Sequence, residues 1–307
     1  MIEKLIVKGM EDGPHLLITA GVHGDEYEPM EAVRRVYKIV EVLQNQLRGT
    51  LTLVPVVNKP AFELGTRTGP DGKDLARICP GDMNGSLSEQ IAYAVSDLIW
   101  SADFYIDMHN GGLNHNIFPF SGYVLHSNQK IREAQRELAK AFLLPIVWGT
   151  DPTLPGRTLS VARDANIPAI YTEIGGQGIY NESYTAMAVD GCLNVLRFLK
   201  MIPGAYCSRE SKYHLEDHRS GSGHLQRLLP APCDGFYIPQ VAFGQRVVAD
   251  EIIGYIQDDL GKKSTPVRAD RDGIVFILRS VPSVREHDPL GAILPVTENS
   301  KMQSIYE

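Results

Sequence analysis

The stretch LLITAGVHGDEYEP, residues 16–29, decides the fold of the first part of the chain. An apolar run stops at Gly21, and a histidine and several acidic residues follow at once. A short apolar run that ends on glycine is typical of a buried strand. The segment that follows, 29–47, has apolar residues at helical spacing. The stretch therefore predicts a strand, a tight turn rich in polar groups, and a helix.

Strand-like and helix-like segments go on alternating as far as residue 201. The predicted strands are 15–21, 50–58, 104–109 and 167–176, and the predicted helices are 29–47, 87–100, 128–144 and 186–200. For the helix 87–100, Ser86 or Ser88 is a suitable N-cap. This alternation favours an α/β fold with a mixed, largely parallel sheet flanked by helices.

Length, charge and cysteine usage restrict the kind of protein. The chain has 307 residues, a net charge of −7 and no block of lysine and arginine, so we expect no nucleic-acid partner. The N-terminus has no signal-peptide pattern, and no apolar run reaches the roughly 18 residues that span a bilayer. Four scattered cysteines without CxxC spacing predict reduced thiols and a cytoplasmic protein. Without an apolar run of that length, we expect no membrane partner.

The composition changes after residue 201. Residues 202–227 are polar and rich in glycine and serine, which predicts a linker or an exposed excursion between a catalytic domain, 1–201, and a C-terminal β domain, 228–307. The β domain contains a weak repeat, with Asp-Gly pairs at 234–235 and 272–273. Two such halves resemble the barrel-sandwich hybrid of biotinyl and lipoyl carriers. Lys262 and Lys263 lie between the halves, but the apolar-flanked context of a carrier lysine is missing, which favours an appendage that shapes the site or an oligomer interface.

Three side chains suggest a metal site. His23 and Glu26 follow the first predicted strand, and His109 ends the strand 104–109. Since ligands of open α/β sheets bind beyond the carboxyl ends of the strands, we expect these side chains to meet. Two histidines and one carboxylate leave a fourth zinc position open, as in catalytic sites. Asp107 could accept the other ring N–H of a zinc histidine, although a cap or a salt bridge would suit it equally.

A third strand end supplies a candidate base. Glu173 follows an apolar strand and precedes two glycines, so it could take a proton from metal-bound water and return it to a leaving amine. A buried structural glutamate is the alternative. The segment 58–81 is rich in glycine and proline and carries Arg67 and Arg77, which would suit an anionic substrate. Ordinary surface arginines would look the same.

Other histidines are weaker candidates. His214, His218 and His224 lie in a polar, glycine-rich segment without an apolar stripe, so we interpret this segment as a solvated loop rather than a second metal site. His115 and His126 could line a cleft or belong to ordinary loops. Tyr180, shortly after Glu173, could also face the cleft.

The ordered motifs HGDE, Arg, DLxRxxPG, DxH and ExG resemble the zinc-carboxypeptidase superfamily, in its succinylglutamate desuccinylase/aspartoacylase branch. The resemblance covers roughly residues 15–200, and many members add a small C-terminal β domain. It implies one zinc ion per chain held by His23, Glu26 and His109, with Glu173 as general base and acid. It further implies that Arg67 polarises the scissile carbonyl and that Arg77 binds a substrate carboxylate.

The sequence departs from this branch at one position. The branch usually reads DLNR where this chain reads DLAR, and Ala76 removes the hydrogen-bonding groups of the asparagine. An acidic amino acid is therefore less well supported as the substrate.

The implied reaction is metal-assisted hydrolysis of the amide bond of an N-acyl amino acid or a related small amine, including an N-acetyl-diaminobutyrate. A carboxypeptidase acting on short peptides and a zinc-holding binding protein without catalysis are the alternatives. Cobalt or manganese would suit the same ligands. Exposed β edges in the C-terminal segment are compatible with self-association.

Overall fold

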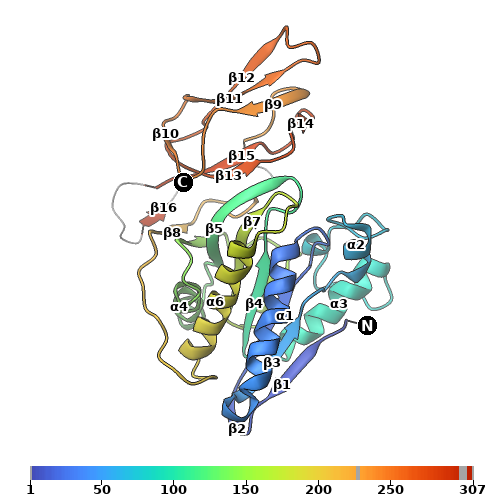
Figure 1. Ribbon diagram of the computed structural model, residues 1–307, viewed down its shortest axis with the longest axis vertical. Helices are drawn as coiled ribbons and strands as arrows, with labels where there is room; N and C mark the ends of the chain where they lie inside the picture. Colours follow the sequence, from blue (N-terminus) through green and yellow to red (C-terminus); the bar gives the residue numbers. More distant parts are fainter. Residues whose placement is uncertain (1, 226–228, 297–302, 306–307) are drawn as a thin grey trace.

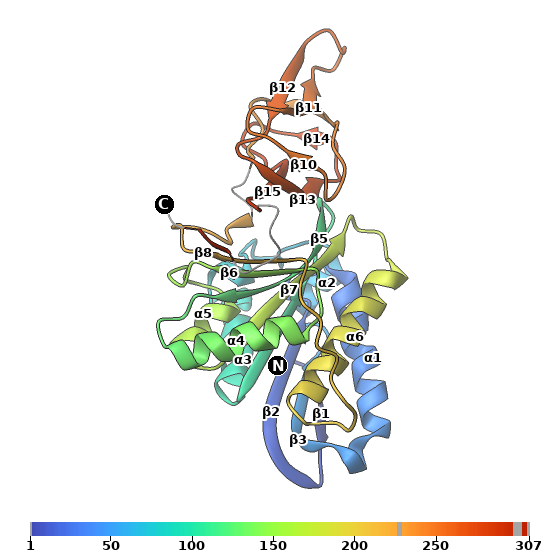
Figure 2. The same cartoon turned by 90° about the vertical axis from the view of Figure 1, so that its left-hand side faces the viewer.

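The computed structural model describes residues 2–225, 229–296 and 303–305. It has an α/β part, in which helices cover both faces of a central sheet, and a part built from strands that rises from one end of that sheet (Figures 1 and 2). The α/β fold expected from the sequence is confirmed.

The central sheet is mixed. Its strands are, in spatial order, β1 (Leu5–Lys8), β3 (Arg48–Val54), β2 (Glu11–Ala20), β4 (Phe104–His109), β7 (Ala169–Gly176), β5 (His115–Val124), β6 (Ile146–Thr150), β8 (Tyr213–Asp217) and β16 (Gln303–Ile305). β3, β2, β4 and β7 are parallel to one another. β5 is antiparallel to β7, and β6, β8 and β16 continue in the direction of β5. The sheet thus consists of two parallel blocks that run in opposite directions, with β1 antiparallel at its edge.

Helices pack on both faces of this sheet. α1 (Tyr27–Val42), α4 (Gln129–Ala141) and α6 (Glu182–Phe198) share one core, and α3 (Leu87–Trp100) and α5 (Thr158–Asp164) share the other. The short α2 (Lys59–Leu64) follows β3. Along β2, Leu16 and Ile18 enter the first core and Leu17 enters the second. A strand covered on both faces has no polar side, which is why this segment reads as a continuous apolar run.

The predicted elements agree with the structure where the apolar pattern is strong. α3 and β4 have the predicted bounds, and a capping box at Ser86 and Glu89 starts α3. The sequence pattern does not predict β5, β6 and α5, which lie between the predicted strands and helices. The segment 58–81, which is rich in glycine and proline, also contains a helix that its pattern does not predict, α2 at Lys59–Leu64.

The segment 202–227 differs from the expected linker. Its residues Tyr213–Asp217 form β8, which pairs in parallel with β6 inside the central sheet. The strand has five residues, and the polar, glycine- and serine-rich sequence around it gives no strand pattern. The solvated-loop interpretation of this stretch is therefore wrong for His214, which is buried in β8. The domain boundaries at 201 and 228 stay predictions.

The C-terminal part consists of β9 (Gly235–Pro239), β10 (Arg246–Val247), β11 (Ile252–Gln257), β12 (Ser264–Arg268), β13 (Gly273–Arg279), β14 (Ser283–Val284) and β15 (Gly291–Leu294). Its two halves exchange short strands. β10 pairs with β13 through Val247 and Gly273, and β14 pairs with β9 through Val284 and Gly235. Both Asp-Gly pairs therefore occupy equivalent positions, at the start of β9 and of β13.

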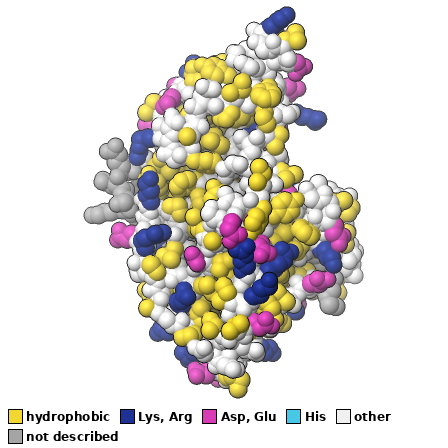
Figure 3. Space-filling model, viewed as in Figure 1, with side chains coloured by type: hydrophobic (Ala, Val, Ile, Leu, Met, Phe, Trp, Pro, Cys, Tyr) yellow, Lys and Arg dark blue, Asp and Glu magenta, His cyan; other side chains and the backbone are white. Residues whose placement is uncertain are grey.

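The C-terminal part joins the central sheet directly. β13 is antiparallel to the first residues of β5, with Ile277 opposite Ile117 and Arg279 opposite His115. Among the described strands, β12, β11, β9 and β14 form a separate sheet. Lys262 and Lys263 lie in the exposed turn between β11 and β12. The face in Figure 3 shows lysine and arginine side chains dispersed among acidic and apolar ones, without one continuous basic patch.

The turn after β2 depends on a close approach of two backbones. A Cβ added to Gly24 would lie 2.0 Å from the carbonyl carbon of Ala61 in α2. The Gly24 N–H also donates to the Thr66 carbonyl at 3.1 Å. Only glycine fits there without displacing α2, so this contact fixes the turn that carries His23 and Glu26.

We predict that Gly24→Ala destabilises the protein by about 1–3 kcal/mol, as overpacking of a rigid contact does. Thermal and urea unfolding measure the loss. Gly69→Ala is the matched control, because its added Cβ would meet nothing closer than 3.5 Å. Equal stability of the two variants would show that the turn does not depend on this contact.

Candidate active site

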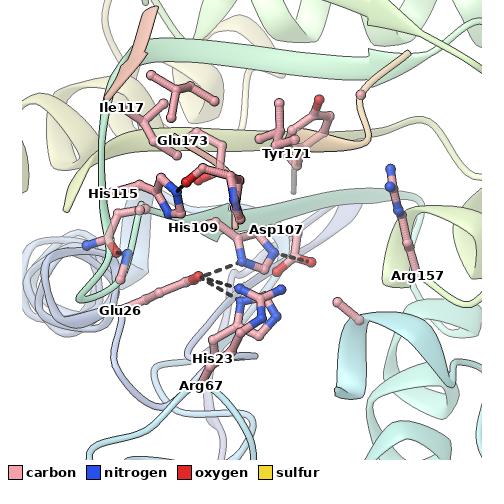
Figure 4. Close-up of a pocket in the computed structure, with 18 of the residues that line it drawn as sticks. His23, Glu26, Arg67, Asp107, His109, His115, Ile117, Arg157, Tyr171 and Glu173 are labelled. Atoms are coloured by element: carbon pink, nitrogen blue, oxygen red, sulfur yellow. Dashed lines mark hydrogen bonds and ion pairs between the residues drawn. The ribbon is translucent and has the colours of Figure 1, made fainter. Parts of the chain in front are cut away.

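His23, Glu26 and His109 lie together at the carboxyl ends of β2 and β4 (Figure 4). Nδ1 of His23 lies 2.7 Å from Oε1 of Glu26, and Nδ1 of His109 lies 2.8 Å from Oε2. One donor atom from each residue falls within 4.8 Å of the other two, and all three side chains are buried. Among the described residues no other group of three histidines, cysteines or acids is arranged in this way.

The carboxylate of Glu26 is the centre of this cluster. Burial opposes its ionisation, but the rings of His23 and His109 outweigh burial and hold the pKa of Glu26 well below its usual range. Glu26 is also the residue directly before α1, where the helix N-terminus favours negative charge. The carboxylate is therefore ionised at neutral pH although water hardly reaches it.

The donor chemistry of the cluster fits a metal ion. Two imidazole nitrogens and a carboxylate oxygen are a ligand set of catalytic zinc sites, which keep a fourth position for water or substrate. The surroundings of the cluster also match such a site. Nε2 of His109, the ring nitrogen that faces away from Glu26, has a carboxylate as its partner.

That partner is Asp107. Its Oδ2 lies 3.0 Å from Nε2 of His109, and its other oxygen accepts a hydrogen bond from Thr19 at 2.8 Å. Thr158 at the start of α5 donates to Oδ2 as well. Burial favours the neutral acid, but the His109 ring and these hydrogen bonds outweigh it and lower the pKa of Asp107. An ionised Asp107 orients the ring and fixes its tautomer, as such partners do at metal sites.

Glu173 lies on β7 beside the cluster. It is the neighbour of His109 in the pairing of β4 with β7, and it lines the same cavity. Burial, with a smaller contribution from the charge of Glu26, raises the pKa of Glu173 to about 8. Its Oε2 is buried and has no hydrogen-bond partner among the residues that the structure describes. A carboxyl group with a raised pKa and a free oxygen in a cavity is suited to exchange protons.

Arg67 reaches the cluster through an acidic residue that the sequence analysis did not single out. Nη2 of Arg67 donates to Oδ2 of Asp74 at 3.1 Å, and Oδ1 of Asp74 lies 3.2 Å from Nε2 of His23. Nη1 of Arg67 is 4.0 Å from Glu26. Burial disfavours a charge on Asp74, yet His23 and Arg67 lower its pKa. Asp74 is the first residue of the motif DLAR, so this motif could have identified Asp74 as a residue of the site.

A cavity of about 400 Å³ extends from the cluster, and Arg77 and Arg157 line it. Arg77 donates to the Ala76 carbonyl at 2.7 Å. Arg157 lies across the cavity from Glu26 (Figure 4), and its guanidinium makes no hydrogen bond or close ion pair with the described residues, although Asp151 attracts its charge from farther away. Burial lowers the pKa of Arg157, which shows that the group has lost part of its hydration. The sequence analysis missed Arg157, and no local pattern marks it.

Segments far apart in the sequence complete the walls. The C-terminal part contributes Ile277, Arg279, Asp288, Pro289 and Gly291, and the segment expected to be a linker contributes Gly223 and Leu225. His115 lines the cavity and donates from Nε2 to the Pro289 carbonyl at 3.1 Å. The C-terminal part therefore limits the space beside the cluster.

The remaining candidates lie elsewhere. His126 contacts the Arg163 carbonyl and the Asn128 N–H, outside the cavity lining. Tyr180 donates to Glu182 on the surface. His214 lies 3.2 Å from the hydroxyl of Tyr123, on the side of the sheet covered by α4.

Comparisons with known proteins agree with this geometry. The family model of the succinylglutamate desuccinylase/aspartoacylase catalytic domain matches residues 12–199 of this chain. The chain is 32% identical over 307 residues to N-alpha-acetyl-L-2,4-diaminobutyric acid deacetylase of Halomonas elongata, a match that covers 97% of this chain and 87% of the relative.

Solved structures extend the likeness over both parts. A succinylglutamate desuccinylase/aspartoacylase from Rhodobacter sphaeroides is 27% identical with a TM-score of 0.84. The product-bound ectoine utilization protein EutE from Ruegeria pomeroyi is 25% identical with a TM-score of 0.87. Each match covers 95% of this chain and 88% of the other. This chain therefore belongs to the succinylglutamate desuccinylase/aspartoacylase family and is a hydrolase of the deacylase type.

Proposed function

We propose that the protein is a zinc-dependent deacylase of small N-acyl amino acids, with one zinc ion held by His23, Glu26 and His109. The observation that carries this proposal is the convergence of these three side chains beside Glu173, whose buried carboxyl has an oxygen without a partner. When bound, zinc supplies Lewis-acid chemistry that polarises the acyl carbonyl and lowers the pKa of water to about 7.

The side chains around the cluster transfer the proton, stabilise the developing charge and orient a metal ligand. Glu173, which lies beside the cluster and lines the cavity, takes the proton of the attacking water and passes it to the departing amine. Arg67, close to Glu26, stabilises the negative charge that develops on the acyl oxygen. Asp107 holds the ring of His109 in one orientation. The products are a carboxylate and a free amino compound.

The charges in the cavity suit a substrate with a carboxylate, and the relative from Halomonas elongata points to an N-acetylated diamino acid. The guanidinium of Arg157, which makes no close ion pair with the described residues, suits the α-carboxylate, and Arg77 provides a second positive charge. Ala76 also lines the cavity and offers no hydrogen bond to a second, side-chain carboxylate. The relative from Halomonas elongata deacetylates N-acetyl-diaminobutyrate, which has a single carboxylate.

A small substrate fits better than a peptide. Residues of the C-terminal part line the cavity, so a long peptide would have to displace them.

No helix within the described ranges is long and apolar enough to cross a membrane. The cytoplasmic location, the absence of nucleic-acid partners and the self-association stay predictions.

We expect Glu173→Gln to reduce kcat by about 10²–10⁴, the usual contribution of a general acid–base residue. Zinc content stays near one equivalent, because Glu173 is not one of the three ligands. Amine release from N-acetyl-2,4-diaminobutyrate measures the first effect and elemental analysis the second. A variant with near-normal kcat would refute the role of Glu173.

Removal of the metal should abolish amine release, and zinc should restore it. Zinc at 100 times its Kd should also stabilise the folded chain by about 2.7 kcal/mol, since only the folded state assembles the site. Thermal unfolding with and without zinc measures this in the wild type and in His109→Ala. A zinc-dependent rise in Tm that survives in His109→Ala would place the metal elsewhere.

Arg157→Ala should lower kcat/KM for N-acetyl-2,4-diaminobutyrate by about 10–100-fold, the value of a hydrogen-bonded charge pair. N-acetyl-1,3-diaminopropane, which lacks the carboxylate, is the control substrate. Its weaker hydrolysis should be the same in both proteins. An equal loss on both substrates would contradict a carboxylate contact.

A further inference from the structure

Glu28 is a buried acid outside the metal cluster and in the first turn of α1. It lies two residues after Glu26, and 3% of its surface is exposed. Oε2 of Glu28 accepts a hydrogen bond from Nδ2 of Asn110 at 2.6 Å. Oε1 accepts one from the backbone N–H of Asn181 at 3.1 Å. A single carboxylate thus connects α1 to two separate loops.

These two loops leave the strands that carry the chemistry. Asn110 directly follows His109 at the end of β4, and its own Oδ1 accepts a hydrogen bond from the Gly112 N–H at 2.8 Å. Asn181 ends the loop between β7, which carries Glu173, and α6. The loops also bond to each other, because Gly111 N–H donates to the Gly175 carbonyl and Gly178 N–H donates to the Gly112 carbonyl, both at 3.0 Å.

The same helix turn therefore binds the end of β4 twice. Glu26 contacts the ring of His109, and Glu28 contacts the side chain of the next residue, Asn110. Through Asn181, Glu28 also restrains the segment after Glu173. The distance between the metal ligands and the base depends on how these three elements are held together.

We propose that Glu28 is a positioning residue, which fixes His109 and Glu173 relative to Glu26 by holding both loops against the start of α1. This inference rests on the proposed function, because it assigns His109 and Glu173 their roles. Glu28 itself touches neither the cavity nor the donor atoms of the cluster. It acts through Asn110, which lines the cavity, and through the backbone of Asn181.

Replacement of Glu28 by glutamine tests the geometry with little change of shape. Both partners of Glu28 are donors, and a carboxylate accepts from both. A glutamine side chain accepts with its oxygen but turns an NH2 group toward the second donor. The helix keeps its apolar contacts, since Ala32, Val33, Val36 and Val40 pack it on the sheet. The variant should therefore fold while the loops lose one attachment.

The experiment measures kcat, KM, zinc affinity and Tm for zinc-loaded wild type, Glu28→Gln and Glu31→Gln. Glu31 is the matched control, because it lies on the same helix and its ion pairs are with Arg34 and Arg35. We expect Glu28→Gln to lose about 10–100-fold in kcat and in zinc affinity, as residues that orient metal ligands do. KM should change less than about twofold, and Glu31→Gln should match the wild type.

A lower Tm with unchanged kcat and zinc affinity would mean that Glu28 is only structural, which overturns the proposal. Asn110→Ala removes the hydrogen bond between Asn110 and Glu28 without changing Glu28. It is therefore the replacement test if Glu28→Gln does not fold. The variant that combines Glu28→Gln and Asn110→Ala completes the test. If its losses in kcat and zinc affinity are no larger than those of the worse single variant, the proposal is supported. If the losses of the two single variants multiply, the proposal is overturned.

Failure of the proposed function would look different. In that case the wild type would bind zinc but release no amine from any N-acyl amino acid. The zinc affinities then decide alone, with weaker binding by Glu28→Gln than by Glu31→Gln supporting the positioning role and equal binding overturning it.

Discussion

The site is organised around one buried negative charge, the carboxylate of Glu26 between the rings of His23 and His109. Both rings and the start of α1 at the next residue stabilise a carboxylate in this position. These contacts require the turn after β2, the end of β4 and the start of α1 to meet. The glycine contact with α2 is one of the features that hold the turn in place.

Much of the fold and the core of the site follow from local sequence patterns. The segment 104–109 is apolar up to a histidine, and this pattern predicts both the strand and the position of His109 at its end. The residues that the sequence analysis missed depend on contacts between distant segments. No pattern beside Arg157 in the sequence indicates that it lines the cavity, and the contacts of Glu28 come from residues more than eighty positions away. Likewise, β8 becomes recognisable only through its pairing with β6.

The C-terminal part is more than an appendage to the catalytic fold. Its two halves exchange β10 and β14, and β13 continues into the central sheet through β5. This pairing places Arg279 opposite His115, and His115 in turn bonds to Pro289 at the cavity wall. The strand exchange explains the repeat of Asp-Gly pairs in the sequence. It also holds the residues of this part that restrict the cavity.

The most direct test of the account is the position of the metal. Crystals of the zinc-loaded protein, measured on both sides of the zinc absorption edge, would locate the ion by its anomalous difference density. The account predicts one strong peak per chain at about 2.0–2.2 Å from a nitrogen of His23, a nitrogen of His109 and an oxygen of Glu26. A peak at any other group of residues, or none between these three in a fully loaded and active protein, would contradict it.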